Sequence, residues 1–428
     1  MVAVAAHLCA RGGGEPRRIT ADSKGWDGNP VYSPDGRSIA YLSQERSGFE
    51  ADRFRLMLYD RQAGRARELT TGLDRSIGTF VWSPDSKTVL ATLDDQGYEP
   101  IVAVDAATGA VRRLVEKVTA GGLSLTRDGR TIVFSSQSEV MPAEVFSVSA
   151  DGSGLKQLTE TNRDLLASRT LVPAEDMWST HADGTKIHSF LVKPAGFDPS
   201  RKYPLLVLVH GGPQSAWGHA FSYRWNPQIF ANAGPYVVLM PNPRGSSGFG
   251  QKFTDAVTGD WGGKPYEDVM RAVDDAAALP YVDATRMGAA GASYGGFMVN
   301  WMMGQTDRFK VYVSHAGIFN TANMGGVTEE LWFTDWEFKG DPWTNPELYE
   351  KWSPNRYVKN FKTPTLVTHG EIDYRVPIDQ GLGLFTALQR RNVPSKLVVF
   401  PDEGHWVLKA LNSRVWHEAV FGWLKKYL

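Results

Sequence analysis

The pattern of apolar and polar positions divides the chain into two regions. Before about residue 165, short apolar runs are separated by turn residues. Three segments of this region, 31–41, 81–90 and 125–134, resemble one another, and each has the form strand, turn, strand. A third strand and a closing strand follow each of them. The aspartates in the three turns, Asp35, Asp85 and Asp128, are 85 − 35 = 50 and 128 − 85 = 43 residues apart. A period of roughly 40–50 residues with four strands per unit is typical of β-propeller blades.

This repeat predicts a partial β-propeller of about three blades over residues 1–165. The blades are expected at about 26–70, 74–115 and 120–159. The first residues fit the same frame, since Met1–Val4 match the third-strand positions Ile101–Val104 and Arg17–Thr20 match the ends of the later repeats. We therefore expect the chain to start inside a blade, which argues against a signal peptide. Because propellers close with about four to eight blades, the chain is either a fragment of a longer coding sequence or completed by a partner subunit.

From about residue 166 the pattern changes to nearly continuous apolar strands that alternate with longer segments. Residues 178–192 have the pattern of a hairpin, while 203–209, 363–370 and 395–400 have that of buried strands. At the end of the chain, Trp416, Val420, Trp423 and Leu424 recur at helical spacing, which indicates packing against a core. This alternation predicts an α/β domain with a doubly wound sheet over residues 166–428.

The chemistry is concentrated in this second region, beginning with the motif Gly291-Ala292-Ser293-Tyr294-Gly295 and a further glycine. It lies between an apolar strand-like run and an apolar helix-like run. A G-x-S-x-G motif in that setting predicts a nucleophile elbow, in which a sharp turn exposes the serine hydroxyl. The motif is common by chance, so its weight depends on the residues that accompany it.

Two further residues complete a catalytic set. Asp373 follows the predicted strand at 363–370, and His405 follows the one at 395–400. The chain order Ser293, Asp373, His405 is that of nucleophile, acid and base in the α/β-hydrolases. A serine hydroxyl needs an imidazole to take its proton, and a carboxylate fixes the imidazole tautomer. The alternative, that both are ordinary loop residues, is disfavoured because each directly follows a predicted parallel strand.

The loop after the strand at 203–209 supplies a fourth element. It has the sequence His210-Gly211-Gly212-Pro213, which matches the loop that donates a backbone N–H to the oxyanion hole of esterase-like enzymes. The second donor would be the N–H of Tyr294, directly after the nucleophile. The alternative is that these glycines merely turn the chain.

Composition and motif content argue against several other classes of protein. The 428 residues suggest two or three domains, and no apolar run reaches the roughly 18 residues that a membrane span needs. With 46 basic and 47 acidic residues and no basic cluster, nucleic acid is not an expected partner. No metal spacing and no nucleotide-binding glycine loop is present, so we expect neither a metal nor a cofactor. The single cysteine, Cys9, forms no intrachain disulfide and does not indicate a compartment.

Predicted blades followed by a hydrolase with a Ser-Asp-His order resemble the prolyl oligopeptidase family of serine peptidases. Five segments carry the resemblance: 210–214, 242–250, 291–296, 369–377 and 402–405. Two more, Leu331–Glu337 and Tyr349–Pro354, are most similar to the branch of the dipeptidyl-peptidases 5 and acylaminoacyl-peptidases.

The resemblance implies a role for each matching residue. Ser293 would attack the scissile carbonyl, His405 would act as base and then as acid, and Asp373 would orient the imidazole. Gly212 and Tyr294 would form the oxyanion hole through their N–H groups. Arg375 matches a position that holds the P2 carbonyl in relatives, although its alternative is a surface arginine. Trp332, Phe333, Trp336, Tyr294 and Val376 would line an apolar S1 pocket, and the alternative for these aromatics is plain core packing.

These residues predict a serine exopeptidase that releases N-terminal dipeptides from oligopeptides, with a hydrophobic P1 residue. An acylaminoacyl-peptidase and a broad carboxylesterase are the enzymatic alternatives. A propeller scaffold with an inactive hydrolase is the non-enzymatic one. The expected partner is an oligopeptide substrate, and the sequence leaves open whether the chain forms a homo-oligomer.

Overall fold

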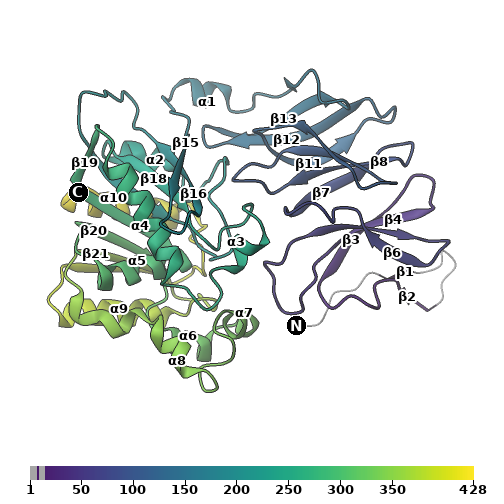
Figure 1. Cartoon of the computed structure of the whole chain (residues 1–428). Coiled ribbons are helices and arrows are strands. Elements are labelled where there is room, and N and C mark those ends of the chain that lie inside the picture. Colours follow the sequence, from purple (N-terminus) through teal and green to yellow (C-terminus); the bar gives the residue numbers. More distant parts are fainter. Residues whose placement is uncertain (1–6, 9–14) are drawn as a thin grey trace. The chain divides into compact units, whose positions relative to one another are not determined.

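The computed structural model describes residues 7–8 and 15–428, which form two compact units (Figure 1). Unit 1 extends to Arg169 and also includes the short segments Gly218–Phe221 and Ser247–Lys252. Unit 2 comprises Thr170–Trp217, Ser222–Ser246 and Phe253–Leu428. The first border thus falls at residue 169, whereas the sequence predicted a domain border at 165.

Unit 1 contains three four-stranded antiparallel sheets, in each of which consecutive strands are neighbours. A two-stranded sheet of β1 (His7–Leu8) and β2 (Arg17–Arg18) precedes them. The predicted strand at Met1–Val4 lies outside the described residues. The strands of the larger sheets are β3 (Asp27–Tyr32), β4 (Ser38–Ser43), β5 (Arg55–Asp60) and β6 (Arg65–Glu68); β7 (Ile77–Trp82), β8 (Thr88–Leu93), β9 (Ile101–Asp105) and β10 (Val111–Val115); and β11 (Thr119–Leu125), β12 (Thr131–Ser138), β13 (Met141–Ser149) and β14 (Lys156–Gln157). The short helix α1 (Arg163–Ala167) follows.

The first hairpin of each sheet closes with the same turn. In the β7–β8 hairpin, Ser83 Oγ donates to Asp85 Oδ1 at 2.6 Å and accepts the N–H of Thr88 at 3.0 Å. The β3–β4 turn repeats these contacts with Ser33 and Asp35, and the β11–β12 turn repeats them with a threonine in place of the serine. Side chains that hydrogen-bond nearby backbone groups stabilise turns, which explains why the repeat is visible in the sequence.

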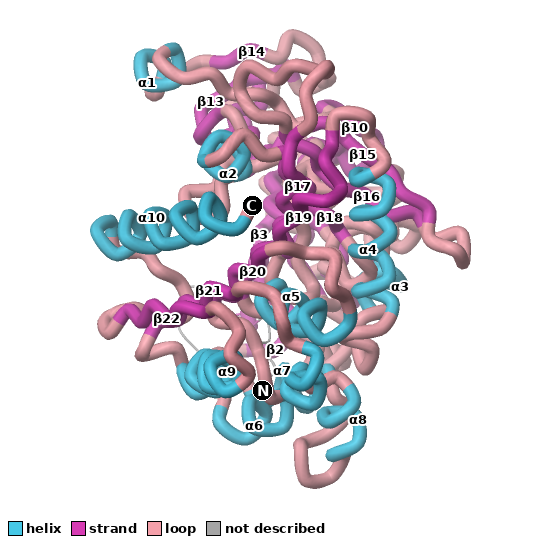
Figure 2. The backbone as a smooth tube through the Cα atoms, turned by 90° about the vertical axis from the view of Figure 1, so that its left-hand side faces the viewer, coloured by secondary structure: helices cyan, strands magenta, loops and turns pink. Residues whose placement is uncertain are grey.

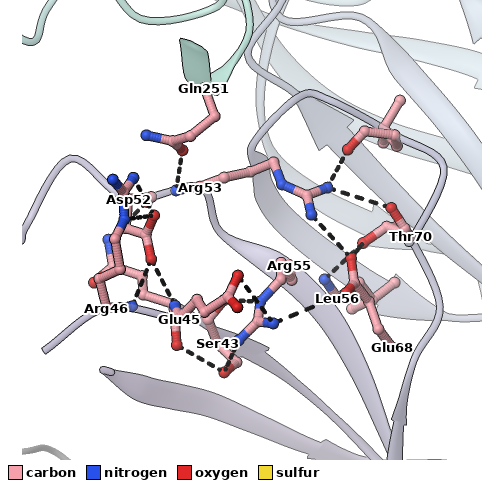
Figure 3. A network of polar contacts seen from close by, with 12 residues as sticks. Ser43, Glu45, Arg46, Asp52, Arg53, Arg55, Leu56, Glu68, Thr70 and Gln251 are labelled. Carbon is pink, nitrogen blue, oxygen red and sulfur yellow. Dashed lines mark hydrogen bonds and ion pairs between the residues drawn. The ribbon is translucent and has the colours of Figure 1, made fainter. Parts of the chain in front are cut away.

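A network of ion pairs and hydrogen bonds joins the connections of the first sheet of unit 1 (Figure 3). Asp52 accepts the N–H groups of Glu45 and Arg46 at 2.6 and 2.8 Å, and it also pairs with the Arg46 guanidinium at 2.7 Å. The neighbouring Arg53 donates its backbone N–H to Gln251 Oε1 at 2.7 Å. These contacts explain why the segment Ser247–Lys252 belongs to unit 1.

Unit 2 is built on one eight-stranded sheet with the order β15-β16-β18-β17-β19-β20-β21-β22. The first three strands pair antiparallel and the others pair parallel. The strands are β15 (Glu175–Thr180), β16 (Lys186–Val192), β17 (Tyr203–Val209), β18 (Val237–Asn242), β19 (Val282–Ala292), β20 (Val311–His315), β21 (Thr365–Gly370) and β22 (Ser395–Phe400). The predicted strands at 203–209 and 395–400 therefore have the bounds of β17 and β22, and the α/β class is confirmed.

Helices cover both faces of this sheet (Figure 2). Helices α2 and α10 lie on one face, and α4, α5 and α9 lie on the other. The helices are α2 (Pro227–Ala233), α3 (Gln251–Asp255), α4 (Lys264–Ala277), α5 (Tyr294–Gln305), α6 (Thr321–Val327), α7 (Leu331–Glu337), α8 (Pro346–Lys351), the 3-10 helix η1 (Pro354–Asn360), α9 (Ile378–Arg390) and α10 (Ala410–Tyr427).

Two helices show how the hydrophobic pattern sets their positions. Every residue of α5 from Tyr294 to Gly304 is buried, which accounts for its continuously apolar sequence. In α10 the buried residues are Trp416, Val420, Trp423 and Leu424, the stripe that the sequence assigned to core packing. Within the described ranges, no helix combines the length and apolar character needed to cross a membrane.

Candidate active site

Ser293 lies at a sharp turn between β19 and α5. Its backbone has φ 59° and ψ −124°, and positive φ is an uncommon conformation for a residue with a side chain. The turn is fixed at both ends, because the N–H of Ser293 donates to His315 O at 3.0 Å and its carbonyl accepts the N–H of Phe297 at 2.8 Å. This is the strand–turn–helix context that a nucleophile elbow requires.

Close backbone approach explains the flanking glycines. A methyl group at Gly291 would lie 2.3 Å from Gly295 O, and one at Gly295 would lie 2.1 Å from Val209 O. Both distances are far below van der Waals contact, so the turn admits no side chain at these positions.

Asp373 and His405 lie together at the carboxyl ends of β21 and β22. His405 Nδ1 is 2.7 Å from Asp373 Oδ2, while Asp373 Oδ1 accepts the N–H groups of Arg375 and Val376 at 3.0 and 2.9 Å. Both side chains are nearly buried, with exposures of 8% for His405 and 0% for Asp373. A carboxylate held in this way favours the tautomer with the proton on Nδ1, so that Nε2 presents a lone pair.

Two buried histidines lie behind this pair. His369 Nε2 donates to Val376 O at 2.7 Å and lies 3.6 Å from Asp373 Oδ2. His315 Nδ1 lies 2.8 Å from Thr368 Oγ1. Burial lowers the pKa of His369, and it lowers the pKa of His315 to about 3. Both rings are therefore neutral near pH 7.

Ser293 and His405 line a common cavity of about 350 Å³ in unit 2. Gly211 and Gly212 form part of the wall, and a methyl group at Gly211 would lie 3.3 Å from Ser293 Cβ. In the described part of the chain, no hydrogen bond joins Ser293 Oγ to His405. Catalytic hydrogen bonds are often long in ligand-free enzymes and shorten in the substrate complex.

The two predicted oxyanion donors are close to this wall. Gly212 has φ 121° and lines the cavity, while Tyr294 is the first residue of α5. Among the described residues, neither backbone N–H has a hydrogen-bond partner. The Tyr294 side chain points elsewhere, since its hydroxyl donates to Trp261 O at 2.7 Å.

Arg375 lines the same cavity. One of its guanidinium nitrogens pairs with Glu330 Oε1 at 2.7 Å, and the guanidinium lies 5.0 Å from the centre of the Trp406 ring. Its Nε is buried without a hydrogen-bond partner in the described chain. The residue is thus held in place and keeps one unused donor.

The structure does not bring the predicted S1 residues into this cavity. Trp332, Phe333 and Trp336 lie on α7, and none of them is part of the cavity lining. Phe333 packs against the core, with its ring 5.9 Å from that of Trp261. Val376 is buried, and its backbone N–H donates to Asp373 Oδ1, beside the contact of Asp373 with His405.

One buried carboxylate in this region was not identified from the sequence. Glu337, at the end of α7, accepts hydrogen bonds from Gln214 Nε2 at 2.8 Å, Thr258 Oγ1 at 3.0 Å and Trp261 Nε1 at 2.8 Å. It thereby joins the loop after Gly212 to Trp261, the residue that Tyr294 contacts. The signal available in the sequence was an acidic residue that ends an aromatic-rich segment.

Arg224 was not identified from the sequence either. This arginine lines the cavity beside Trp406, and its guanidinium lies 5.3 Å from the centre of that ring. Nothing in the local sequence distinguishes it from a surface arginine. No cluster of three or more His, Cys, Asp or Glu side chains suited to a metal ion occurs in the ranges that the structure describes.

Comparison with known proteins identifies similar sequences. The model of the prolyl oligopeptidase family matches residues 221–428. Dipeptidyl-peptidase 5 from Porphyromonas gingivalis is 35% identical over 97% of this chain, which covers 61% of that protein. A probable dipeptidyl-peptidase 5 from Emericella nidulans is 40% identical over 97% of the chain, which covers 58% of it. The chain therefore spans about three fifths of the length of these relatives.

A solved structure of an acylaminoacyl peptidase in complex with Z-Gly-Gly-Phe-chloromethyl ketone matches 99% of this chain with a TM-score of 0.86 at 25% identity. This chain covers 66% of that structure. The part of the chain that contains Ser293, Asp373 and His405 thus matches the prolyl oligopeptidase family, and the whole chain is similar to longer proteins named dipeptidyl-peptidase 5 and acylaminoacyl peptidase.

Proposed function

We propose that this protein is a serine exopeptidase that releases dipeptides from the N-termini of oligopeptides. One observation carries the proposal: the hydrogen-bonded pair of Asp373 and His405 borders the cavity in which Ser293 occupies a positive-φ turn. The names of the relatives add the dipeptidyl specificity.

The proposed reaction follows from these positions. Nε2 of His405 takes the proton from Ser293 Oγ as that oxygen attacks the peptide carbonyl, and Asp373 stabilises the resulting imidazolium. His405 then gives the proton to the leaving amine, which leaves an acyl-enzyme on Ser293. Water, activated by the same imidazole, hydrolyses this ester and regenerates the serine. Substrate binding brings Ser293 and His405 into hydrogen-bonding geometry.

The N–H groups of Gly212 and Tyr294 are proposed to bind the oxyanion. Both lack an intrachain acceptor in the described residues, and the Gly211–Gly212 wall lies close to the Ser293 side chain. A donor of this kind typically contributes roughly 3 kcal/mol to transition-state stabilisation.

Arg375 is proposed to hold the P2 carbonyl. Its place in the cavity lining supports this role, and the ion pair with Glu330 keeps the guanidinium in place. The sequence resemblance alone supports a further proposal, an apolar S1 pocket. It would be formed by Trp332, Phe333, Trp336, Tyr294 and Val376, none of which lines the cavity that contains Ser293.

We also propose that the three four-stranded sheets of unit 1 are blades of a β-propeller, within a domain of residues 1–165 that precedes a hydrolase domain of residues 166–428. Their consecutive antiparallel order and their repeated turns support this interpretation.

An acylaminoacyl-peptidase is the second candidate, since the matching solved structure carries that name. The two activities differ in the substrate N-terminus that they accept. Turnover of dipeptidyl coumarin amides with a free amine, and not of their N-acetyl forms, is expected for the dipeptidyl-peptidase. A strict requirement for the acetyl group would reject it.

Labelling with a fluorophosphonate tests the catalytic proposal directly. The wild-type protein should react, while Ser293→Ala should not react although it remains folded. Absence of labelling in folded wild-type protein would contradict a serine hydrolase.

A further inference from the structure

Arg224 has an unused guanidinium inside the cavity that holds Ser293. Its guanidinium lies 5.3 Å from the centre of the Trp406 ring and, within the described chain, forms no ion pair or side-chain hydrogen bond. Arg375, which lines the same cavity and lies over the same ring, is paired with Glu330 at 2.7 Å. A guanidinium stays charged at every physiological pH and presents five N–H donors, so Arg224 is equipped for an anion that the chain itself does not supply.

The backbone that carries Arg224 is held firmly. Ser222 Oγ accepts the N–H groups of Arg224 and Trp225 at 3.2 and 3.0 Å. Trp225 is buried and its ring stacks on Phe230, with 5.5 Å between the ring centres. The next residue, Asn226, caps α2 through its side chain. The base of the arginine is therefore fixed while its tip stays accessible, as a ligand-binding side chain requires.

The cavity also has a single sign of charge. Among the described residues that line it, none is an aspartate or glutamate, and the two permanently charged ones are Arg224 and Arg375. Its volume of about 350 Å³ leaves room for substrate groups beyond the scissile bond. Clefts with one sign of charge attract ligands of the opposite sign, and guanidinium binds carboxylate with two parallel hydrogen bonds.

We infer that Arg224 binds a carboxylate of the peptide substrate in this cavity. The inference rests on the proposed peptidase function and adds a preference for substrates with a negative charge close to the scissile bond. That carboxylate has two sources in a peptide: the C-terminus of a short substrate, or the side chain of an aspartate or glutamate.

Paired substrates with Arg224→Gln test the inference. The first pair is the tripeptide Gly-Phe-Ala with a free C-terminal carboxylate and with a C-terminal amide. The second pair is two C-terminally amidated pentapeptides that carry either aspartate or asparagine after Gly-Phe. Arg224→Gln should raise KM roughly tenfold for the partner that bears the carboxylate and less than twofold for its neutral counterpart, since hydrogen bonds between two charged groups are about twice as strong as neutral ones. The affected pair identifies the source of the carboxylate.

Arg201→Gln is the matched control, because Arg201 is also exposed and lies 5.7 Å from the centre of an aromatic ring, that of Tyr203. It should leave KM unchanged for all four peptides. Equal effects of Arg224→Gln on the charged and neutral partners of both pairs would overturn the inference.

Calorimetric binding to the Ser293→Ala protein separates this inference from the catalytic proposal, since it requires no turnover. The free-acid tripeptide or the aspartate peptide should bind roughly tenfold more weakly after the additional Arg224→Gln change. If binding shows this loss while the wild-type protein hydrolyses nothing, the carboxylate site stands and the peptidase proposal fails. If neither charged peptide loses affinity, the carboxylate site is rejected.

Discussion

The two units are both built around β-sheets, yet the strands of unit 1 pair antiparallel and most strands of unit 2 pair parallel, which requires longer connections. In unit 1 each strand pairs with the strand before or after it in the chain, as β7, β8, β9 and β10 do. In unit 2, β17 pairs with β19 and joins Leu205 to Met287 across more than eighty residues. Antiparallel pairing through short turns repeats one small structure in unit 1. In unit 2 the parallel order β19-β20-β21-β22 brings the carboxyl ends of β19, β21 and β22, and with them Ser293, Asp373 and His405, to one sheet edge. The chemistry is therefore expected to depend on unit 2.

The largest expected effect is on catalysis. Ser293→Ala and His405→Ala should each lower kcat by at least about 10⁴-fold, and the double variant should lose little more, because the two side chains act as a unit. Hydrolysis of an activated ester measures the rates. Multiplicative losses in the double variant would show that the two residues do not act together.

Removal of a buried ion pair should lower the stability of unit 2 and leave that of unit 1 unchanged. Asp268 is fully buried and accepts the backbone N–H and Nε of Arg244 at 2.9 and 2.8 Å. Asp268→Asn should lower the free energy of unfolding of unit 2 by about 3–5 kcal/mol, since it leaves Arg244 without its buried counter-charge. Hydrogen exchange in β17–β19 would report the loss, while β7–β9 should keep their protection.

Asp183→Asn is the control for that change. Asp183 pairs with the same arginine at 2.6 Å, but its side chain is 41% exposed. Its substitution should lower the free energy of unfolding of unit 2 much less. A loss as large as that of Asp268→Asn would show that burial of the carboxylate does not determine the effect.

Acidification should also affect the units differently. Burial lowers the pKa of His210 to about 4 and that of His315 to about 3, whereas an unfolded histidine titrates near 6.5. Between pH 6.5 and 4 the unfolded state therefore binds protons that the folded state excludes, so the stability of unit 2 falls as the pH decreases. The resulting loss of stability is about 3 kcal/mol for His210 and about 5 kcal/mol for His315, complete by the time the pH reaches the folded pKa of each ring.

Denaturant titrations at several pH values, followed by exchange at individual strands, would measure this loss. The four-stranded sheets of unit 1 contain no histidine and should not show a decrease that begins near pH 6.5. A decrease of equal size in both units over that range would refute the assignment to buried histidines.

Glu337→Gln should have a moderate effect. The amide keeps the shape of the side chain but loses one acceptor, so one of the donors Gln214, Thr258 and Trp261 is left unsatisfied. We expect unit 2 to lose about 1–3 kcal/mol. Asp335→Asn removes a negative charge from an exposed position of the same helix, α7, and should leave the unfolding midpoint unchanged. If Asp335→Asn lowers the stability as much as Glu337→Gln does, the cause is the lost charge on α7 and not the buried hydrogen bonds.

The smallest effect is expected in unit 1. Ser83→Ala removes the hydroxyl that accepts the N–H of Thr88 and contacts Asp85, which should cost about 1 kcal/mol. Exchange protection should decrease in β7 and β8 and should be unchanged in unit 2. Loss of protection in β17–β19 would show that the units unfold together.

The predictability of the fold follows this same division. The repeated turns at Asp35, Asp85 and Asp128 and the apolar strands β17 and β22 are local signals, and they predicted the corresponding elements. The order Ser293, Asp373, His405 placed three residues after strands, and the structure brings Asp373 and His405 into contact. Short motifs with fixed backbone requirements can be recognised without coordinates.

Residues that depend on packing could not be predicted in this way. Glu337 is important because Gln214, Thr258 and Trp261 converge on it from distant segments. Arg224 differs from other arginines only through the cavity beside Trp406. The sequence left open whether the aromatic residues of α7 line a pocket or pack in the core, because that depends on neighbours from distant segments; Trp332 is 37% exposed, whereas Phe333 packs against Trp261.

The positive φ of Ser293 has an evolutionary consequence. Glycine adopts this backbone conformation more readily than serine does, so Ser293→Gly would relieve strain as it removes the hydroxyl. Selection for a sturdier fold alone would favour that replacement. Persistence of serine at this place in descendants of the gene would record continued selection for the reaction itself.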